Sequence, residues 1–120
     1  MSKLIMIVDD DRMTVELVKR RLEENGYATL TASDGQEALN LLATKTPDLI
    51  ILDVEMPNMN GYTFIVEKNK IPACTKVPVI VSTSHQETQP LFARHGVRSY
   101  LIKPLNMQDL LKRITEICGS

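Results

Sequence analysis

The chain has 120 residues, of which 43% are hydrophobic and 24% charged, and its formal net charge is −1. This balance predicts a single globular domain over residues 1–120 and excludes a disordered or fibrous chain. Because positive charge is not in excess, we expect no direct binding of nucleic acid or of an anionic membrane surface.

Five apolar segments of strand length alternate with segments of helical character. The five are Leu4–Val8, Ala28–Thr31, Leu49–Leu52, Val79–Val81 and Tyr100–Ile102. Such an alternation predicts an α/β fold in which helices wrap a parallel sheet. The third segment is continuously apolar between Asp48 and Asp53. It is therefore predicted to lie in the middle of the sheet, buried on both faces.

No apolar run approaches the roughly 18 residues that span a bilayer, and no signal peptide is evident, so a cytoplasmic protein is expected.

The first predicted helix carries an apolar face and a clear end. Leu17, Val18 and Leu22 are expected on its buried side. Asn25-Gly26 is typical of the left-handed residue that follows a helix. The helix should therefore end near residue 25.

Capping signals mark the start of two further helices. Asp34 is followed three residues later by Glu37, and Asn106 by Asp109. Both pairs resemble capping boxes, in which a side chain accepts a hydrogen bond from a free backbone N–H of the first turn. The second and last helices are predicted to begin there.

Prolines limit the third and fourth helices. A short helical segment over Ile65–Ile71 is broken by Pro72, and Pro90 must lie in the first turn of the fourth helix or before it. The bounds of these two helices are the least determined by the sequence.

Polar residues follow the predicted strands at their carboxyl ends, where open parallel sheets bind ligands. They are Asp9-Asp10-Asp11 after the first strand, Asp53 after the third, Ser82-Thr83-Ser84 after the fourth and Lys103-Pro104 after the fifth. Neighbouring strands lie about 4.8 Å apart, so carboxylates at their ends would repel one another. Mg²⁺ resolves such a conflict. Lys103 and Thr83 could hold oxygens of a phosphoryl group, and Asp53 could act as its nucleophile.

Together these segments resemble the receiver domains of two-component response regulators. The resemblance is carried by Val8-Asp9-Asp10-Asp11, by Leu52-Asp53 with Met56-Pro57 and Gly61, by Pro78-Val79-Ile80-Val81-Ser82-Thr83 and by Tyr100-Leu101-Ile102-Lys103-Pro104. It implies a flavodoxin-like, doubly wound fold with five parallel strands in the order 2-1-3-4-5 and five helices. The motifs cover nearly the whole chain, in family order.

The same resemblance assigns roles around the carboxylates. It implies that Asp53 is the phosphoacceptor and that Asp9 and Asp10 bind Mg²⁺ directly or through water. The backbone carbonyl of Glu55 would complete the protein ligands. Asp11 is expected to cap the first helix; a solvated cap is also the alternative for the whole acidic run.

Further implied roles fall on the fourth and fifth strands. Thr83 and Lys103 would hold phosphoryl oxygens, and the Lys103–Pro104 peptide would be cis. Tyr100 would move between outward and inward rotamers as the Thr83 loop moves; plain core packing is its alternative. The neighbouring hydroxyls of Ser82 and Ser84 leave open which one moves, although the spacing after Pro78 favours Thr83.

Two positions are candidates for tuning dephosphorylation. Glu55 and His85 stand two residues past Asp53 and Thr83. In receivers these positions line the approach of the attacking water, so we hypothesise that they set the lifetime of the phosphorylated state.

The resemblance also implies partners. A sensor histidine kinase or a histidine phosphotransfer protein would donate the phosphoryl group. A downstream protein would bind the face of the fourth helix, fifth strand and fifth helix, around Phe92, Val97, Tyr100 and Met107. The chain would assist only its own phosphorylation and dephosphorylation, so it is not expected to be an enzyme in the usual sense.

Three other functions fit the residues less well. An interaction module that is never phosphorylated would have lost Asp53 or Lys103, and both are present. Hydrolases with an aspartyl nucleophile usually carry a DxD motif after the first strand, whereas the best nucleophile here follows the third. An acidic loop after the first strand would repel the phosphate of a flavin.

Overall fold

Five strands form one parallel sheet in the order β2-β1-β3-β4-β5. The computed structural model describes residues 2–54, 59, 61–83 and 97–118. Its elements are β1 (Leu4–Val8), α1 (Arg12–Glu24), β2 (Ala28–Ala32), α2 (Gly35–Leu42), β3 (Leu49–Asp53), α3 (Gly61–Lys68), the 3-10 helix η1 (Pro72–Cys74), β4 (Val79–Thr83), β5 (Val97–Ile102) and α5 (Met107–Cys118). The predicted class, strand order and central place of the third strand are confirmed. The described ranges contain four α-helices, and the predicted fourth helix falls outside them.

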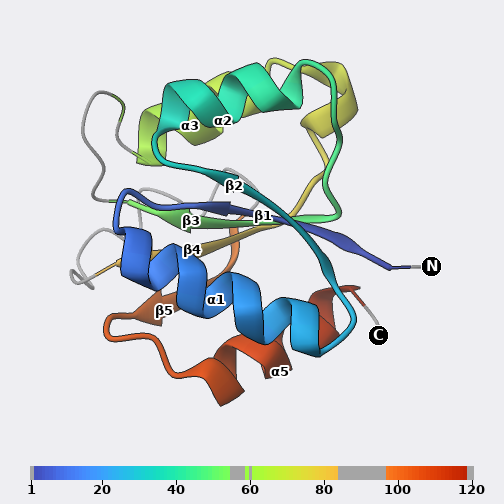
Figure 1. Ribbon diagram of the computed structural model, residues 1–120. Helices are drawn as coiled ribbons and strands as arrows, with labels where there is room; N and C mark the ends of the chain where they lie inside the picture. The colour runs from blue at the N-terminus through green and yellow to red at the C-terminus, as the bar shows by residue number, and fades with distance from the viewer. Residues whose placement is uncertain (1, 55–58, 60, 84–96, 119–120) are drawn as a thin grey trace.

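The sheet lies between two layers of helices (Figure 1), α2 and α3 on one face and α1 and α5 on the other. Side chains of a strand alternate between the two faces. Met6, Val8, Ile50 and Leu52 pack toward α2 and α3, whereas Ile5, Ile7, Leu49 and Ile51 pack toward α1 and α5. Every residue of β3 is buried. This alternation decides below which functional side chains can meet.

Helix α1 buries a narrower face than the sequence predicts. Val15, Val18 and Leu22 pack against the core at spacings of three and four residues. Leu17 is 59% exposed, so its predicted burial is wrong. One helical residue turns the side chain by about 100°, which takes Leu17 away from this stripe. The predicted end is confirmed, because the helix stops at Glu24 and Gly26 has a φ of 88°.

Helices α2 and α5 begin at the predicted caps. The backbone N–H of Glu37 donates to Asp34 Oδ1 at 2.8 Å, and that of Asp109 donates to Asn106 Oδ1 at 3.0 Å. The Glu37 carboxylate accepts from the N–H of Ser33 at 3.2 Å, one residue before the cap. The caps therefore fix where both helices leave the carboxyl edge of the sheet.

Helix α3 covers Gly61–Lys68 instead of the predicted Ile65–Ile71. The predicted break is confirmed, since Pro72 opens η1 after Ile71 has turned extended at φ −91° and ψ 110°. A residue before proline avoids the helical region, so the helix ends upstream of it. Among the described residues, no helix has both the length and the hydrophobicity that crossing a membrane requires.

Lys68, at the end of α3, has no exposed surface. Its Nζ donates to Asn69 Oδ1 at 3.0 Å and to Thr75 O at 3.4 Å, and burial lowers the pKa of the ammonium group. We expect Lys68→Met to raise the free energy of unfolding at pH 7 by about 1 kcal/mol, because a buried charge is exchanged for an apolar chain of similar length. The gain should shrink as the pH rises toward the ordinary lysine pKa of 10.5. The Lys68 ammonium group loses its proton more readily in the folded chain than in the unfolded chain, so the wild type becomes more stable as the pH rises.

Urea unfolding at pH 7 and pH 10 measures both effects. The control is Lys70→Met, since Lys70 is an exposed lysine on the same turn, paired with Glu67. Surface ion pairs contribute little, so its stability should barely change. A less stable Lys68→Met at pH 7 would show that the two hydrogen bonds outweigh the cost of burying the charge.

Candidate functional site

The alternation of side chains brings an aspartate from each of two strands to one side of the sheet. Ile5 and Ile7 of β1, and Leu49 and Ile51 of β3, face α1 and α5. Two residues further along, Asp9 and Asp53 continue this pattern and face the same side. Parallel β1 and β3 are direct neighbours, so their carboxyl ends meet. The predicted juxtaposition of the two carboxylates follows from register alone.

Lys103 reaches this pair from beyond the end of β5. Its Nζ lies 3.0 Å from Asp53 Oδ1 and 4.0 Å from Asp9 Oδ2. Asp53 is only 2% exposed, so this ion pair is shielded from solvent on the carboxylate side. The backbone N–H of Lys103 donates to Thr83 O at 2.9 Å, which ties the lysine to the end of β4.

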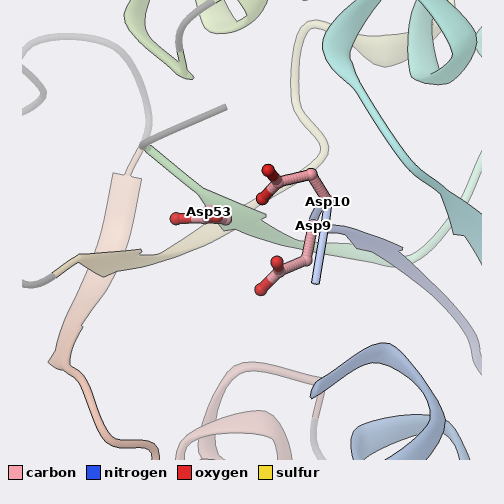
Figure 2. A group of neighbouring side chains, drawn as sticks. All are labelled: Asp9, Asp10 and Asp53. Carbon is pink, nitrogen blue, oxygen red and sulfur yellow. The ribbon is translucent and has the colours of Figure 1, made fainter. Parts of the chain in front are cut away.

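Asp10 joins the two buried aspartates (Figure 2), where its carboxylate lies above the strand ends, that of Asp9 lies below them and that of Asp53 lies between the two. One oxygen from each of Asp9, Asp10 and Asp53 lies within 4.8 Å of the other two. Asp9 and Asp53 are buried, whereas Asp10 is exposed to solvent. Three carboxylates face one lysine, which leaves an excess of negative charge. Hard oxygen donors of this kind, open to water on one side, fit Mg²⁺.

The electrostatics of Asp9 also favour a cation. Burial raises the pKa of its carboxyl group, and the neighbouring carboxylates of Asp10 and Asp11 add to this rise. A hydrogen bond from the Asp11 backbone N–H at 2.8 Å and the charge of Lys103 oppose it without cancelling it. The ionised form of Asp9 is therefore under-compensated by the protein itself, and a bound cation would supply what is missing.

Asp11 has the separate role that was predicted for it. It caps α1, accepting from the Met13 N–H at 3.1 Å and from Thr14 Oγ1 at 2.8 Å. The bond from Thr14 is the main reason why the pKa of this exposed carboxyl lies below its ordinary value. The three-carboxylate group does not include Asp11.

Thr83 and Tyr100 lie on the opposite face of the sheet from Asp53. Thr83, buried at the end of β4, follows Val79 and Val81, which pack toward α2 and α3. Tyr100 pairs with Val81 across the ladder and packs half-buried against the same core, where burial raises the pKa of its phenol. The two residues of the predicted switch therefore share one face.

Other predicted features are partly described. The Lys103–Pro104 peptide is cis, as the resemblance implied. Glu55, Ser84, His85 and Phe92 fall outside the described residues, so the predicted carbonyl ligand and the positions for tuning dephosphorylation stay predictions.

A cavity beside the carboxylates was missed by the sequence reasoning. It measures about 200 Å³ and is lined in part by Asp9, Asp10, Arg12, Ser33 and Glu37. The lining comes from the end of β1, the start of α1, the end of β2 and the start of α2, and no sequence motif indicates that these parts enclose a cavity. Only the sheet order shows that they meet beside Asp10.

Comparison with known proteins decides the family. The model of the response regulator receiver domain matches residues 5–115, nearly the whole chain. The chain belongs to the response regulator receiver family. Receiver domains are signalling switches of two-component systems, interact with histidine kinases and downstream targets, and are generally not enzymes in the usual sense.

Relatives of this receiver domain differ in length. Protein PilH of Pseudomonas aeruginosa is 34% identical over 115 residues, a match that covers 94% of this chain and 95% of PilH. The alkaline phosphatase synthesis transcriptional regulatory protein PhoP of Bacillus subtilis is 32% identical over 117 residues, which cover 98% of this chain but 49% of PhoP. The receiver thus spans nearly all of one relative and about half of the other.

Solved structures of receivers share the fold. The chemotaxis response regulator CheY4 of Vibrio cholerae superposes with a TM-score of 0.92 at 29% identity, covering 98% of this chain and 99% of CheY4. The receiver domain of a sensor histidine kinase from Pseudomonas aeruginosa PAO1 reaches a TM-score of 0.90 at 24% identity, with complete coverage of both chains. At that identity the likeness concerns the fold; that protein holds a magnesium ion in its active site cleft.

Proposed function

We propose that this receiver is a phosphorylation switch in which Asp53 accepts a phosphoryl group with the help of Mg²⁺. The observation that carries the proposal is the buried Asp53 carboxylate, paired with Lys103 at 3.0 Å and flanked by Asp9 and Asp10. A carboxylate that is paired with a lysine and flanked by two further carboxylates able to hold Mg²⁺ suits attack on phosphorus. The donor is a phosphohistidine on a sensor kinase or a phosphotransfer protein.

The transfer balances as a displacement at phosphorus. An Asp53 carboxylate oxygen forms the new P–O bond while the P–N bond to the donor imidazole breaks, and the imidazole leaves with the electron pair and takes up a proton. Lys103 neutralises one phosphoryl oxygen, and the hydroxyl of Thr83 donates to another. Asp9, Asp10, Asp53 and the predicted carbonyl of Glu55 would hold Mg²⁺, which would neutralise charge on the remaining oxygens.

Switching requires that the phosphoryl group interact better with one arrangement of the domain than with another. Thr83 would supply that difference by moving toward the phosphoryl group, and Tyr100, on the same face, would follow into the space that Thr83 leaves. The backbone link from Lys103 to Thr83 couples the two strand ends that surround the phosphoryl group.

The output surface would then include β5 and the start of α5. Val97, Tyr100 and Met107 are all half-buried; the first two pack against the core under α2 and α3, and Met107 of α5 packs against the core of the other face. A downstream protein that binds this surface would read the position of Tyr100. Lifetime tuning by Glu55 and His85 remains part of the proposal.

Nuclear magnetic resonance of the isotope-labelled chain tests the switch. Adding Mg²⁺ should shift the amide signals of Asp9, Asp10 and Asp53, and adding beryllofluoride, a mimic of the acyl phosphate, should extend the shifts to Thr83 and Tyr100. In Asp53→Asn, the beryllofluoride step should have no effect. Shifts that never reach Tyr100, or that are the same in Asp53→Asn, would instead support an interaction module that is not phosphorylated.

A further inference from the structure

The chain that follows Asp53 is held at its base. The backbone N–H of Val54 donates to Ser82 O and that of Gly61 donates to Val54 O, both at 3.1 Å. A Cβ added to Gly61 would lie 2.9 Å from the Cα of Val54. Only glycine therefore lets the start of α3 approach the backbone of Val54 so closely. The end of β3 and the start of α3 are therefore held together beside Asp53.

Between Val54 and Gly61, the structure describes Met59, and this residue packs on α2. A Cβ added to Gly35, the first residue of α2, would lie 2.9 Å from Met59 Sδ and 3.0 Å from both its Cβ and its Cγ. Met59 is half-buried and packs against the same core as α2 and α3. The whole side chain, and not only its flexible end, thus occupies the space that the missing side chain of Gly35 leaves.

The start of α2 is itself a wall of the carboxylate site. Ser33 and Glu37, which flank Gly35, line the cavity that Asp9 and Asp10 also line. Ser33 is fixed there by its hydrogen bonds to the Glu37 carboxylate. Met59 therefore connects the chain that follows Asp53 to the start of α2, which lies beside Asp10.

We propose that Met59 is a positioning residue of the metal site: seated on Gly35, it ties residue 59 to the start of α2, which lies beside the carboxylates, and so raises the affinity for Mg²⁺. The inference rests on the proposed function, because the Mg²⁺ site is part of it. No charge or ligand atom of Met59 is involved; its role is to fix a point of the backbone six residues after Asp53 against α2. Residues that orient metal ligands typically change metal affinity by 10- to 100-fold when they are removed.

Calorimetric titration of the full chain with Mg²⁺ tests this role. Met59→Ala should raise the Kd for Mg²⁺ by about tenfold. Met59→Leu should bind nearly as tightly as the wild type, because leucine has a similar volume and can fill the same seat. Gly35→Ala should also weaken binding by displacing Met59, and its effect should be smaller in a Met59→Ala background, since the contacts with Sδ and Cγ are then absent and only the one with Cβ remains.

Ile71→Ala is the matched control. Ile71 is another half-buried apolar residue against the same core, but it follows the end of α3, away from the carboxylates. It should lose stability in urea unfolding with no change in the Kd for Mg²⁺. If Met59→Ala also loses stability while its Kd equals that of the wild type, Met59 is a packing residue only and the inference is wrong. If the wild type itself binds no Mg²⁺, the proposed function fails instead.

Discussion

Asp53→Asn should lower the rate of phosphorylation by more than about 100-fold, because a carboxamide does not provide the anionic oxygen that attacks phosphorus. Of the two buried carboxylates that face Lys103, that of Asp53 lies nearer, with Nζ 3.0 Å from its Oδ1 against 4.0 Å from Asp9 Oδ2. Asparagine has nearly the same shape, so the fold and the neighbouring Asp9 and Asp10 should be retained. Incubation with phosphoramidate and Mg²⁺, followed by intact-mass measurement, gives the rate directly.

Asp48→Asn provides the control for this loss. Asp48 stands before the amino end of the same strand, where its Oδ2 accepts a hydrogen bond from the N–H of Leu4 at 2.8 Å. Asp48 and Asp53 flank the same apolar run, but Asp48 lies at the amino edge of the sheet, opposite to the carboxylate site. Phosphorylation should proceed at the wild-type rate in this variant, and equal incorporation into Asp53→Asn and wild type would refute the role of Asp53.

Saturating Mg²⁺ should raise the free energy of unfolding by about 2.7 kcal/mol when its concentration is 100 times the Kd. The reason is that β1 and β3 bring the three carboxylates together only in the folded chain. The gain corresponds to an increase in Tm of about 10 °C for a domain of this size. Thermal unfolding followed by circular dichroism, with EDTA and then with increasing Mg²⁺, measures it.

Variants of two adjacent aspartates, Asp10 and Asp11, distinguish specific binding of Mg²⁺ from a general effect of surface charge. Asp10→Asn removes a carboxylate from the cluster and should abolish most of the Mg²⁺-dependent gain. Asp11→Asn removes the same charge one residue later but preserves the cap, since asparagine caps helices as well as aspartate does. It should keep the gain. An identical loss in both variants would mean that Mg²⁺ acts only by screening the acidic surface.

The sheet and the core of the site could be predicted because short-range patterns specify them. Apolar runs mark the strands, and the polar residues that end them must meet at one edge once the strands are parallel. The caps at Asp34 and Asn106 were predictable for the same local reason, since each side chain serves a backbone N–H within its own first turn. The place of Lys103 at the same edge as Asp53 followed from the parallel strands, whereas its direct pairing with Asp53 at 3.0 Å was not predicted.

Features that depend on tertiary packing were beyond the sequence. Leu17 has the polarity of a core residue, but only the packed sheet shows that half-buried Val15 packs against the core instead. The contact between Met59 and Gly35 joins residues 24 positions apart, and neither a charge nor a motif indicates it in the sequence. The cavity beside Asp10 likewise arises where the β2–α2 connection meets α1.

The most direct test of phosphorylation at Asp53 is to locate the modified residue. The chain is reacted with phosphoramidate and Mg²⁺ and then reduced with borohydride, which converts an aspartyl phosphate to homoserine, and its peptides are sequenced by mass spectrometry. The proposal predicts homoserine at position 53 and unmodified aspartate at positions 9, 10 and 11. Homoserine at another aspartate, or at none, would contradict it.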